Sequence, residues 1–366
     1  MANEPRSPTR TRIVRGSGRA ERRSAKHRRA VWRRRALAAV VLIVGYVLIG
    51  WLTATRLAAH HGSTSRDPRP MLRSRPARSP EHLAVRRLPF TLPVALQDTA
   101  GVPLGSGRAA LFGGLNGADT STATVSVLDA RGFTTSASLP EAQHDAQGAM
   151  LDGRAYIFGG GQFSSYEHIL AYNPDTDAVT QVGSLPMPTS DAAVAALAGT
   201  AYIVGGYDGQ QALDTIIAWR PGGQPKIVAR LPYGLRYAAV AAIDSRLLIA
   251  GGSHGEAATT AMLSYDPATH ELRHIGDLPA PITHAVAIAL GSYVYVLGGR
   301  GSAPGTQSSA ILAVDPATGR SMRVGRLPEP LSDAVAIPLG NRVWLVGGLS
   351  PNGPVDSVLE LTPTPP

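Results

Sequence analysis

The chain has 366 residues, of which 40 are Gly and 29 are Pro, and it contains no Cys. The many Gly and Pro residues favour short strands and turns over long helices, and the lack of Cys excludes disulfide scaffolds, thiol catalysis and iron–sulfur clusters. The net charge of +9 comes from the N-terminal tail: residues 1–35 carry 13 Lys and Arg against two Glu, whereas residues 88–366 carry 14 against 22 Asp and Glu.

An uncharged segment follows the basic tail. Residues 36–55 (ALAAVVLIVGYVLIGWLTAT) contain no ionisable acid or base, and a helix of this length spans about 30 Å, the thickness of a bilayer core. Trp32 and Trp51 lie near its ends, and three consecutive Arg precede it. By the positive-inside rule the tail stays in the cytoplasm and the rest of the chain lies outside. We therefore expect a single-pass anchor in the cell membrane, with a disordered tail that sets topology and binds no nucleic acid.

Two other interpretations of residues 36–55 stay open, a cleaved signal peptide and a buried core helix. A signal peptide usually has a short basic region and an Ala-x-Ala site, whereas here 35 residues come first. Residues 56–81, rich in Arg, Pro and Ser, are predicted to form an extended linker, which leaves residues 82–366 as the folded domain. The abundance of Arg, Ala, Gly and Pro indicates a GC-rich bacterial genome.

A repeat organises the folded domain. Four or five apolar residues followed by Gly-Gly recur six times, at steps of 46 to 49 residues, and a Leu-Pro pair recurs in the same register. The glycine pairs, to which we assign a structural role, are Gly113-Gly114, Gly159-Gly160, Gly205-Gly206, Gly251-Gly252, Gly298-Gly299 and Gly347-Gly348.

Each repeat is predicted to form four strands. In the third repeat they are Asp191–Leu197, Ala201–Val204, Thr215–Trp219 and Lys226–Arg230, separated by Gly, Pro and Asp turns. Four short strands at this period are typical of β-propeller blades, and an Ala-rich first strand suits a position near the axis, where blades taper. The sequence therefore predicts an all-β propeller with six blades.

The last repeat lacks its fourth strand. Residues 83–89 (LAVRRLP) match residues 322–328 (MRVGRLP) and precede the first repeat without strands of their own. The N-terminal segment is therefore predicted to supply the outer strand of the last blade, which closes the ring and removes an exposed edge.

The Gly-Gly pairs, the Asp-Pro turns and the Leu-Pro ends resemble kelch repeats over about residues 82–362. Kelch repeats also form the propellers of galactose oxidase and of bacterial sialic-acid mutarotases. The position where that family usually has a strand-four Trp holds Val179, Leu272 and Ser321. The copper radical chemistry of galactose oxidase is excluded, because it needs a Tyr–Cys crosslink. The resemblance implies a binding or scaffolding module for a protein or glycan; the alternative is a carbohydrate-active enzyme of the sugar mutarotase or isomerase type.

Two motif matches carry no chemistry. Residues 270–274 fit H-E-x-x-H, but they fall on a predicted outer strand, where the two histidines would lie about 13 Å apart and could not share one zinc. Residues 251–255 fit G-x-S-x-G, but no helix follows to form a nucleophile elbow. We assign no metal, no cofactor and no catalytic residue, and favour binding over catalysis.

The predicted ligand site lies where first strands begin. Counting back 14 and 15 residues from each Gly-Gly gives a polar pair, Asp98-Thr99 in the first repeat. In propellers these starts and the loops after Gly-Gly open on one face, where polar side chains suit a sugar, a peptide or a cation. We expect the fold itself to have little use for these charges. The predicted ligand-binding residues are His144, Asp145, Asp191, Tyr207, Asp208, Arg236, Tyr237, His254, His284, Arg300 and Asp333.

Overall fold

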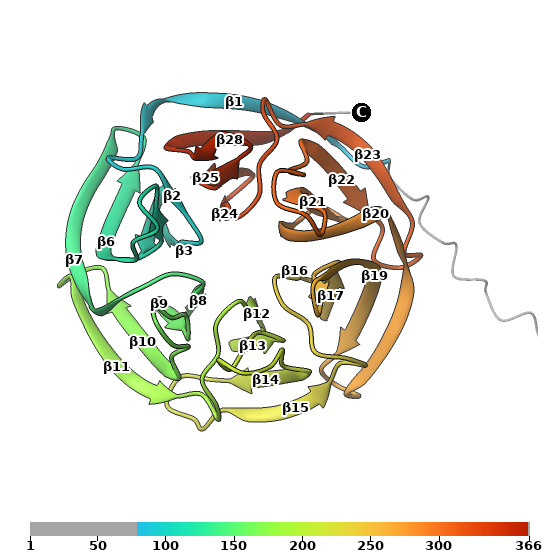
Figure 1. The fold of residues 1–366 in the computed structure, drawn as a ribbon, viewed down its shortest axis with the longest axis horizontal. Helices are drawn as coiled ribbons and strands as arrows, with labels where there is room; N and C mark the ends of the chain where they lie inside the picture. Colours follow the sequence, from blue (N-terminus) through green and yellow to red (C-terminus); the bar gives the residue numbers. More distant parts are fainter. Residues whose placement is uncertain (1–78, 365–366) are drawn as a thin grey trace, which may run out of the picture. The chain divides into compact units, whose positions relative to one another are not determined.

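The computed structural model describes residues 79–364, which fold into sheets arranged around a common axis (Figure 1). The predicted tail 1–35, the predicted anchor 36–55 and residues 56–78 of the predicted linker lie outside the described residues. No helix among residues 79–364 is long and apolar enough to cross a membrane. The described domain is an all-β propeller.

Three sheets each contain four consecutive long strands, ordered from the axis to the rim. Their strands are β3 (Ala100–Gly105), β4 (Arg108–Phe112), β6 (Thr122–Asp129) and β7 (Gly132–Gln143); β8 (Gln147–Leu151), β9 (Arg154–Phe158), β10 (His168–Asn173) and β11 (Ala178–Ser184); and β12 (Ala193–Leu197), β13 (Thr200–Val204), β14 (Thr215–Trp219) and β15 (Lys226–Arg230).

One larger sheet has eight strands because a long strand takes part twice. The first part of β20 pairs with β19, from Glu271 to Ile282, and its last part pairs with β21, from Thr283 to Leu290. The strands are β16 (Ala239–Ile243), β17 (Arg246–Ala250), β18 (Ser253–His254), β19 (Ala257–Asp266), β20 (Glu271–Leu290), β21 (Tyr293–Arg300), β22 (Ala310–Val314) and β23 (Ser321–Arg326).

Both ends of the domain meet in the remaining four-stranded sheet. It contains β1 (His82–Thr91), β28 (Ser357–Thr364), β25 (Arg342–Val346) and β24 (Val335–Leu339), with β1 outermost. β1 pairs antiparallel with β28, for example Val85 with Leu361 (Figure 1). This pairing is the closure that residues 83–89 predict. Two short hairpins, β2 (Leu96–Gln97) with β5 (Leu115–Asn116) and β26 (Leu349–Ser350) with β27 (Gly353–Pro354), complete the described strands.

The core lies between neighbouring sheets. Tyr202 and Ile216 of the β12–β15 sheet pack with Leu247 and Tyr265 of the next sheet in one buried cluster, and similar clusters recur around the ring. Alternating apolar residues on each strand supply both faces of these layers. The aromatic residue at the end of β14, Trp219, is buried against the rings of Tyr156 and Phe158 in the preceding sheet.

The glycine pairs join each four-strand repeat to the next. The first glycine of every pair has φ between 59° and 64°, and the second between 83° and 114°, a region that glycine enters without steric cost. The second amide donates to a carbonyl that precedes the next first strand, as Gly206 does to Leu235 at 2.8 Å. Gly348 makes the same bond to Leu96, also at 2.8 Å, and so links the last repeat to the first.

Candidate functional site

A closed ring of backbone hydrogen bonds encircles the axis where the first strands begin. Each of its six residues has a left-handed backbone, with φ between 52° and 57°. The N–H of each donates to the carbonyl of the ring residue before it, at 2.9–3.2 Å, and the N–H of the first donates to the carbonyl of the last. The six residues of this axial belt are Asp98, Asp145, Asp191, Tyr237, His284 and Asp333.

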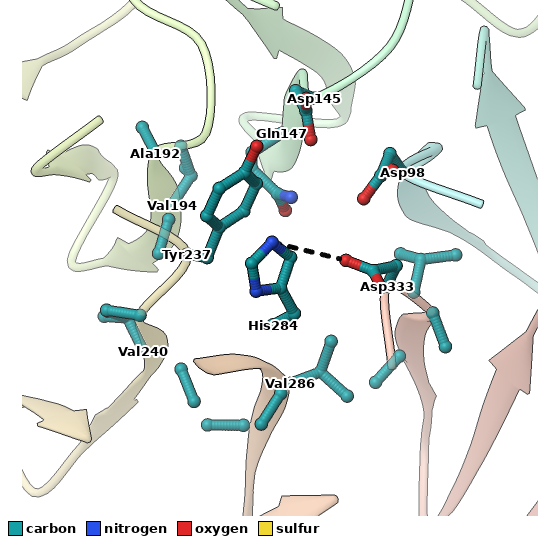
Figure 2. A pocket seen from close by; sticks show the side chains of 18 of the residues that line it. Asp98, Asp145, Gln147, Ala192, Val194, Tyr237, Val240, His284, Val286 and Asp333 are labelled. Carbon is teal, nitrogen blue, oxygen red and sulfur yellow. Dashed lines mark ion pairs between the residues drawn. The ribbon is translucent and has the colours of Figure 1, made fainter. Parts of the chain in front are cut away.

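The belt explains part of the residue choice at these positions. Asp and His occupy the left-handed region several times more often than other side chains, whereas Tyr rarely does. The Tyr237 ring stacks on the His284 ring, with centroids 3.6 Å apart and planes 21° from parallel. The belt directs its side chains toward the axis, where Figure 2 shows Asp98, Asp145, Tyr237, His284 and Asp333 around one cavity.

The axial cavity has a volume of about 130 Å³. The belt side chains form its polar part, and small residues of the first strands, among them Val194, Val240 and Val286, form the rest (Figure 2). A narrow space with apolar walls and carboxyls at one level suits a small polar group better than a large ligand.

Two further cavities border the belt. One, the mouth groove, has a volume of about 360 Å³ and is lined by His144, Asp145, Gln162, Phe163, Ser164, Ser165, Ser190, Asp191, Tyr207, Arg236 and Tyr237, with Gly161 and Gly209. The other, the mouth cavity, has about 270 Å³ and is lined by Gln97, Asp98, Leu115, His144, Asp145, Tyr237, His284, Arg300, Asp333 and Leu349.

An arginine organises the mouth groove. Arg236 Nε and Nη2 donate to Asp191 Oδ2 at 2.6 and 2.5 Å, and the guanidinium lies 4.4 Å from the centroid of the Tyr207 ring. The Asp191 side chain is only 3% exposed, whereas the Arg236 side chain is 31% exposed. Burial lowers the pKa of Arg236, but Asp191 and Tyr237 more than offset this and raise it overall. The pair therefore stays ionised, with part of the guanidinium facing the groove.

The other belt carboxyls are harder to ionise. Burial raises the pKa of Asp98 and of Asp145, and neighbouring carboxyls raise both further. Burial also raises the pKa of Asp333, although the Ser332 hydroxyl, which donates to it at 2.5 Å, and Arg300 oppose the rise. Like charges held close together in a low-dielectric site disfavour ionisation in this way.

The belt histidine stays neutral. Burial lowers the pKa of His284 to about 2, and Arg300 and Arg236 add to the effect. Arg300 Nη2 donates to His284 Nε2 at 3.1 Å, and Asp333 Oδ1 lies 3.7 Å from the same nitrogen (Figure 2). A neutral ring that accepts at Nε2 carries its proton on Nδ1.

Nine of the eleven predicted ligand-binding residues line the axial cavity, the mouth groove or the mouth cavity. Asp208 and His254 do not. The Asp208 carboxylate accepts from the amides of Gln210 and Gln211 at 2.8 and 2.7 Å, which caps its own turn. The exposed His254 ring contacts the carbonyl of Gly234 at 3.2 Å and the ring of Tyr233.

Two residues of the site were outside the predicted set. Asp98 is a full member of the belt, and its signal was its offset from Gly113, the same as that of Asp145 from Gly160. Phe163 borders the mouth groove and is 96% exposed; an aromatic residue in the loop after Gly-Gly was its only signal.

The motif at residues 270–274 lies on the outer part of the ring, as its strand prediction implies. β20 begins at Glu271, His270 Nδ1 hydrogen-bonds Tyr265 Oη at 2.9 Å, and His274 Nε2 lies 3.5 Å from Asp277 Oδ2. Among residues 79–364, no group of three His, Cys, Asp or Glu side chains is arranged to hold a metal ion.

Comparisons with known proteins support the fold. A family model for the kelch motif matches residues 188–223, which contain β12, β13 and β14. No curated protein matches the chain. The solved structure of YjhT is similar over 75% of this chain and 97% of that chain, with a TM-score of 0.64 and 18% sequence identity. At this identity the likeness concerns the fold alone: the chain contains a kelch motif within an all-β propeller.

Proposed function

We propose that this chain is a membrane-anchored, extracytoplasmic propeller that binds a protein or glycan ligand at the face where the axial belt opens. The observation that carries the proposal is the convergence of nine predicted polar residues on connected cavities at one end of the axis. Binding sites combine a concave surface with a few placed polar groups, and the belt supplies such groups from every repeat.

The mouth groove offers complementary chemistry for such a ligand. The Asp191–Arg236 pair presents an acceptor and a donor side by side, and the Ser165 and Ser190 hydroxyls lie 3.0 Å apart nearby. Phe163 adds an exposed ring at the edge of the groove. An exposed aromatic beside satisfied charges is typical of surfaces that bind sugars or peptides.

The blade count of six belongs to the same proposal. Six glycine pairs and six belt residues recur around the axis, and β20 takes the outer position beside β19 and the inner position beside β21. Counting β20 as two strands divides the eight-stranded sheet into two blades.

A sugar isomerase is the second candidate, because the axial cavity also holds groups with perturbed proton affinity. Asp333 and the neutral His284 lie 3.7 Å apart, and three carboxyls have raised pKa values. Such groups in a cavity are candidates for acid–base chemistry.

The experiment that tests binding uses the purified full chain in detergent on glycan and peptide arrays. Arg236→Lys keeps the charge but loses the two-pronged contact with Asp191, so it should weaken binding of any captured ligand at least about tenfold. The matched control is Arg230→Lys, whose arginine pairs with Asp214 at 2.5 Å on the exposed β15. Equal losses in both variants, or no loss in either, would place the site elsewhere.

Topology is tested separately with reporter fusions after residue 60 and after residue 366. The uncharged segment behind an Arg cluster leads us to expect an exported signal from both. A cytoplasmic signal from either would overturn the proposed orientation, and a mature N-terminus near residue 60 would show cleavage.

A further inference from the structure

The belt divides into two chemically different arcs. Following its hydrogen bonds, Asp333, Asp98, Asp145 and Asp191 are consecutive, and Tyr237 and His284 complete the ring. Four carboxyls therefore share one side of the axis, and the stacked Tyr237–His284 pair occupies the other (Figure 2).

The acidic arc has too few cations of its own. Arg236 is engaged by Asp191, and Arg300 by His284. Among the described residues no cationic side chain pairs with Asp98, whose hydrogen bond is to the Asp333 carboxyl. Asp145 bonds the Asp191 carboxyl and lies 3.5 Å from His144 Nε2, an imidazole whose pKa burial lowers.

The backbone does not require this acidity. Asn enters the left-handed region as readily as Asp and would bring no repulsion between neighbouring carboxylates. Acidic side chains at Asp98 and Asp145 therefore add a cost that the belt alone would avoid.

A second observation in the same cavity concerns His284. Its side chain is 9% exposed and projects into the axial cavity (Figure 2). Its Nδ1 atom is buried and has no hydrogen-bond partner. A buried donor without an acceptor is costly, and in this cavity it lies opposite the carboxyls.

The shape of the site distinguishes between kinds of cation. The carboxyls are spread along the belt, and no three acidic or His side chains converge as metal ligands do within residues 79–364. A larger cation with several N–H donors fits an arc, and an aromatic face opposite an acidic wall favours organic cations.

We propose that the mouth cavity binds the ammonium group of its ligand, held by Asp98, Asp145 and Asp333 with the Tyr237–His284 pair on the other side. This inference rests on the proposed function, because it names the chemistry of the ligand bound at the same face. The ammonium group belongs either to a small amine or to a lysine side chain of a protein partner.

Proton release accompanies binding. Burial and neighbouring carboxyls hold the pKa values of Asp98 and Asp145 above their ordinary range, and an ammonium group beside them favours the ionised forms. Affinity for the amine should therefore rise between pH 5 and pH 8.

The experiment is calorimetric titration of the full chain in detergent with hexylamine and with hexanol, which share the alkyl chain. Hexylamine should bind at least about tenfold more tightly, because charge-assisted hydrogen bonds require the ammonium group. Its binding should release protons, measured as a difference between buffers of different ionisation enthalpy. Asp98→Asn and Asp145→Asn should each lower the affinity about tenfold.

The matched control is Asp152→Asn, which changes an exposed left-handed aspartate in the turn between β8 and β9 and should leave affinity unchanged. A lysine peptide and its Nε-acetylated form distinguish the sources: tighter binding of the peptide than of hexylamine indicates a protein partner, and equal binding indicates a small amine.

Equal binding of hexanol and hexylamine, or unchanged affinity in folded Asp98→Asn and Asp145→Asn chains, would overturn the ammonium site. If an array ligand without an amine binds in an Arg236-dependent manner while hexylamine does not, only the ammonium inference fails. If no ligand is captured and hexylamine does not bind, the proposed function fails with it.

Discussion

Asp191 shows how one belt residue serves both the fold and the site. Its φ is 57°, its N–H donates to the Asp145 carbonyl, and its own carbonyl accepts from Tyr237. The expectation that the fold has little use for these residues was therefore wrong. Alanine at such a backbone costs about 1–2 kcal/mol, so Asn, which tolerates the conformation, is the substitution that separates binding from stability.

The glycine pairs lead to a prediction on stability. A Cβ added at Gly205, where φ is 64°, would overlap the Leu235 carbonyl oxygen, the acceptor for Gly206. Gly205→Ala should lower the free energy of unfolding by about 3 kcal/mol, since strain from the left-handed backbone and overpacking add. Chemical denaturation monitored by tryptophan fluorescence measures the change.

Gly199 provides the control for Gly205. It lies in the turn after β12 with φ of 72°, and a Cβ there would meet nothing within 4 Å. Gly199→Ala should therefore cost only the backbone strain, about 1 kcal/mol. Similar losses in the two variants would show that the close approach at Leu235 has no energetic weight.

The belt carboxyls predict a pH dependence of stability. The pKa of Asp145 is raised in the folded state, so above its unfolded pKa the folded state binds more protons, and stability falls as the pH rises through the folded pKa. Asp145→Asn removes this fall. The variant should gain stability relative to the natural chain between pH 4 and pH 8, by at most about 1.4 kcal/mol per pH unit, in urea denaturation.

His284 acts in the opposite direction, because its folded pKa of about 2 lies below the unfolded value, and its contribution is lost as the pH falls below about 6.5. Asp152→Asn should reproduce the natural pH profile. The same profile in Asp145→Asn would mean that Asp145 ionises as easily in the folded state as in the unfolded chain.

At the scale of elements, local sequence predicted strands better than their ends. β14 and β15 have the predicted bounds, but β12 begins at Ala193 rather than Asp191, because the left-handed Asp191 interrupts the extended backbone. β11 and β15 end before their Leu-Pro pairs, whereas β20 continues through Leu278-Pro279. Proline suits an extended backbone as well as a turn, so the pair alone could not distinguish the two outcomes.

The candidate site was predictable where spacing determines it. The fixed offset from Gly-Gly located the belt because every repeat builds its first strand in the same way. The ion pair between Arg236 and Asp191 joins neighbouring repeats, and neither its partner choice nor the inward burial of Asp191 follows from spacing. Asp208 and His254 were misplaced because loop conformation, set by local capping, decides where those side chains lie.

The whole ring depends on contacts between its two ends. Leu83 and Leu88 of β1 are buried, and Arg86 pairs with Glu360 of β28 at 2.7 Å. Glu360 also accepts from Arg342 at 3.2 Å and from the indole of Trp344 at 3.3 Å. β1 therefore covers an edge that would otherwise expose unpaired backbone groups and apolar side chains.

Removing β1 should open the ring. A fragment of residues 80–366 should fold cooperatively, whereas a fragment of residues 92–366 loses the burial of Leu83 and Leu88, about 3 kcal/mol or more. We expect its melting temperature to fall by at least about 5 °C and the exposed β28 edge to promote aggregation, measured by calorimetry and light scattering. Adding a synthetic peptide of residues 80–91 should restore both properties, because the peptide can pair with β28. Equal melting temperatures of the two fragments would mean that β1 lies on the ring without closing it.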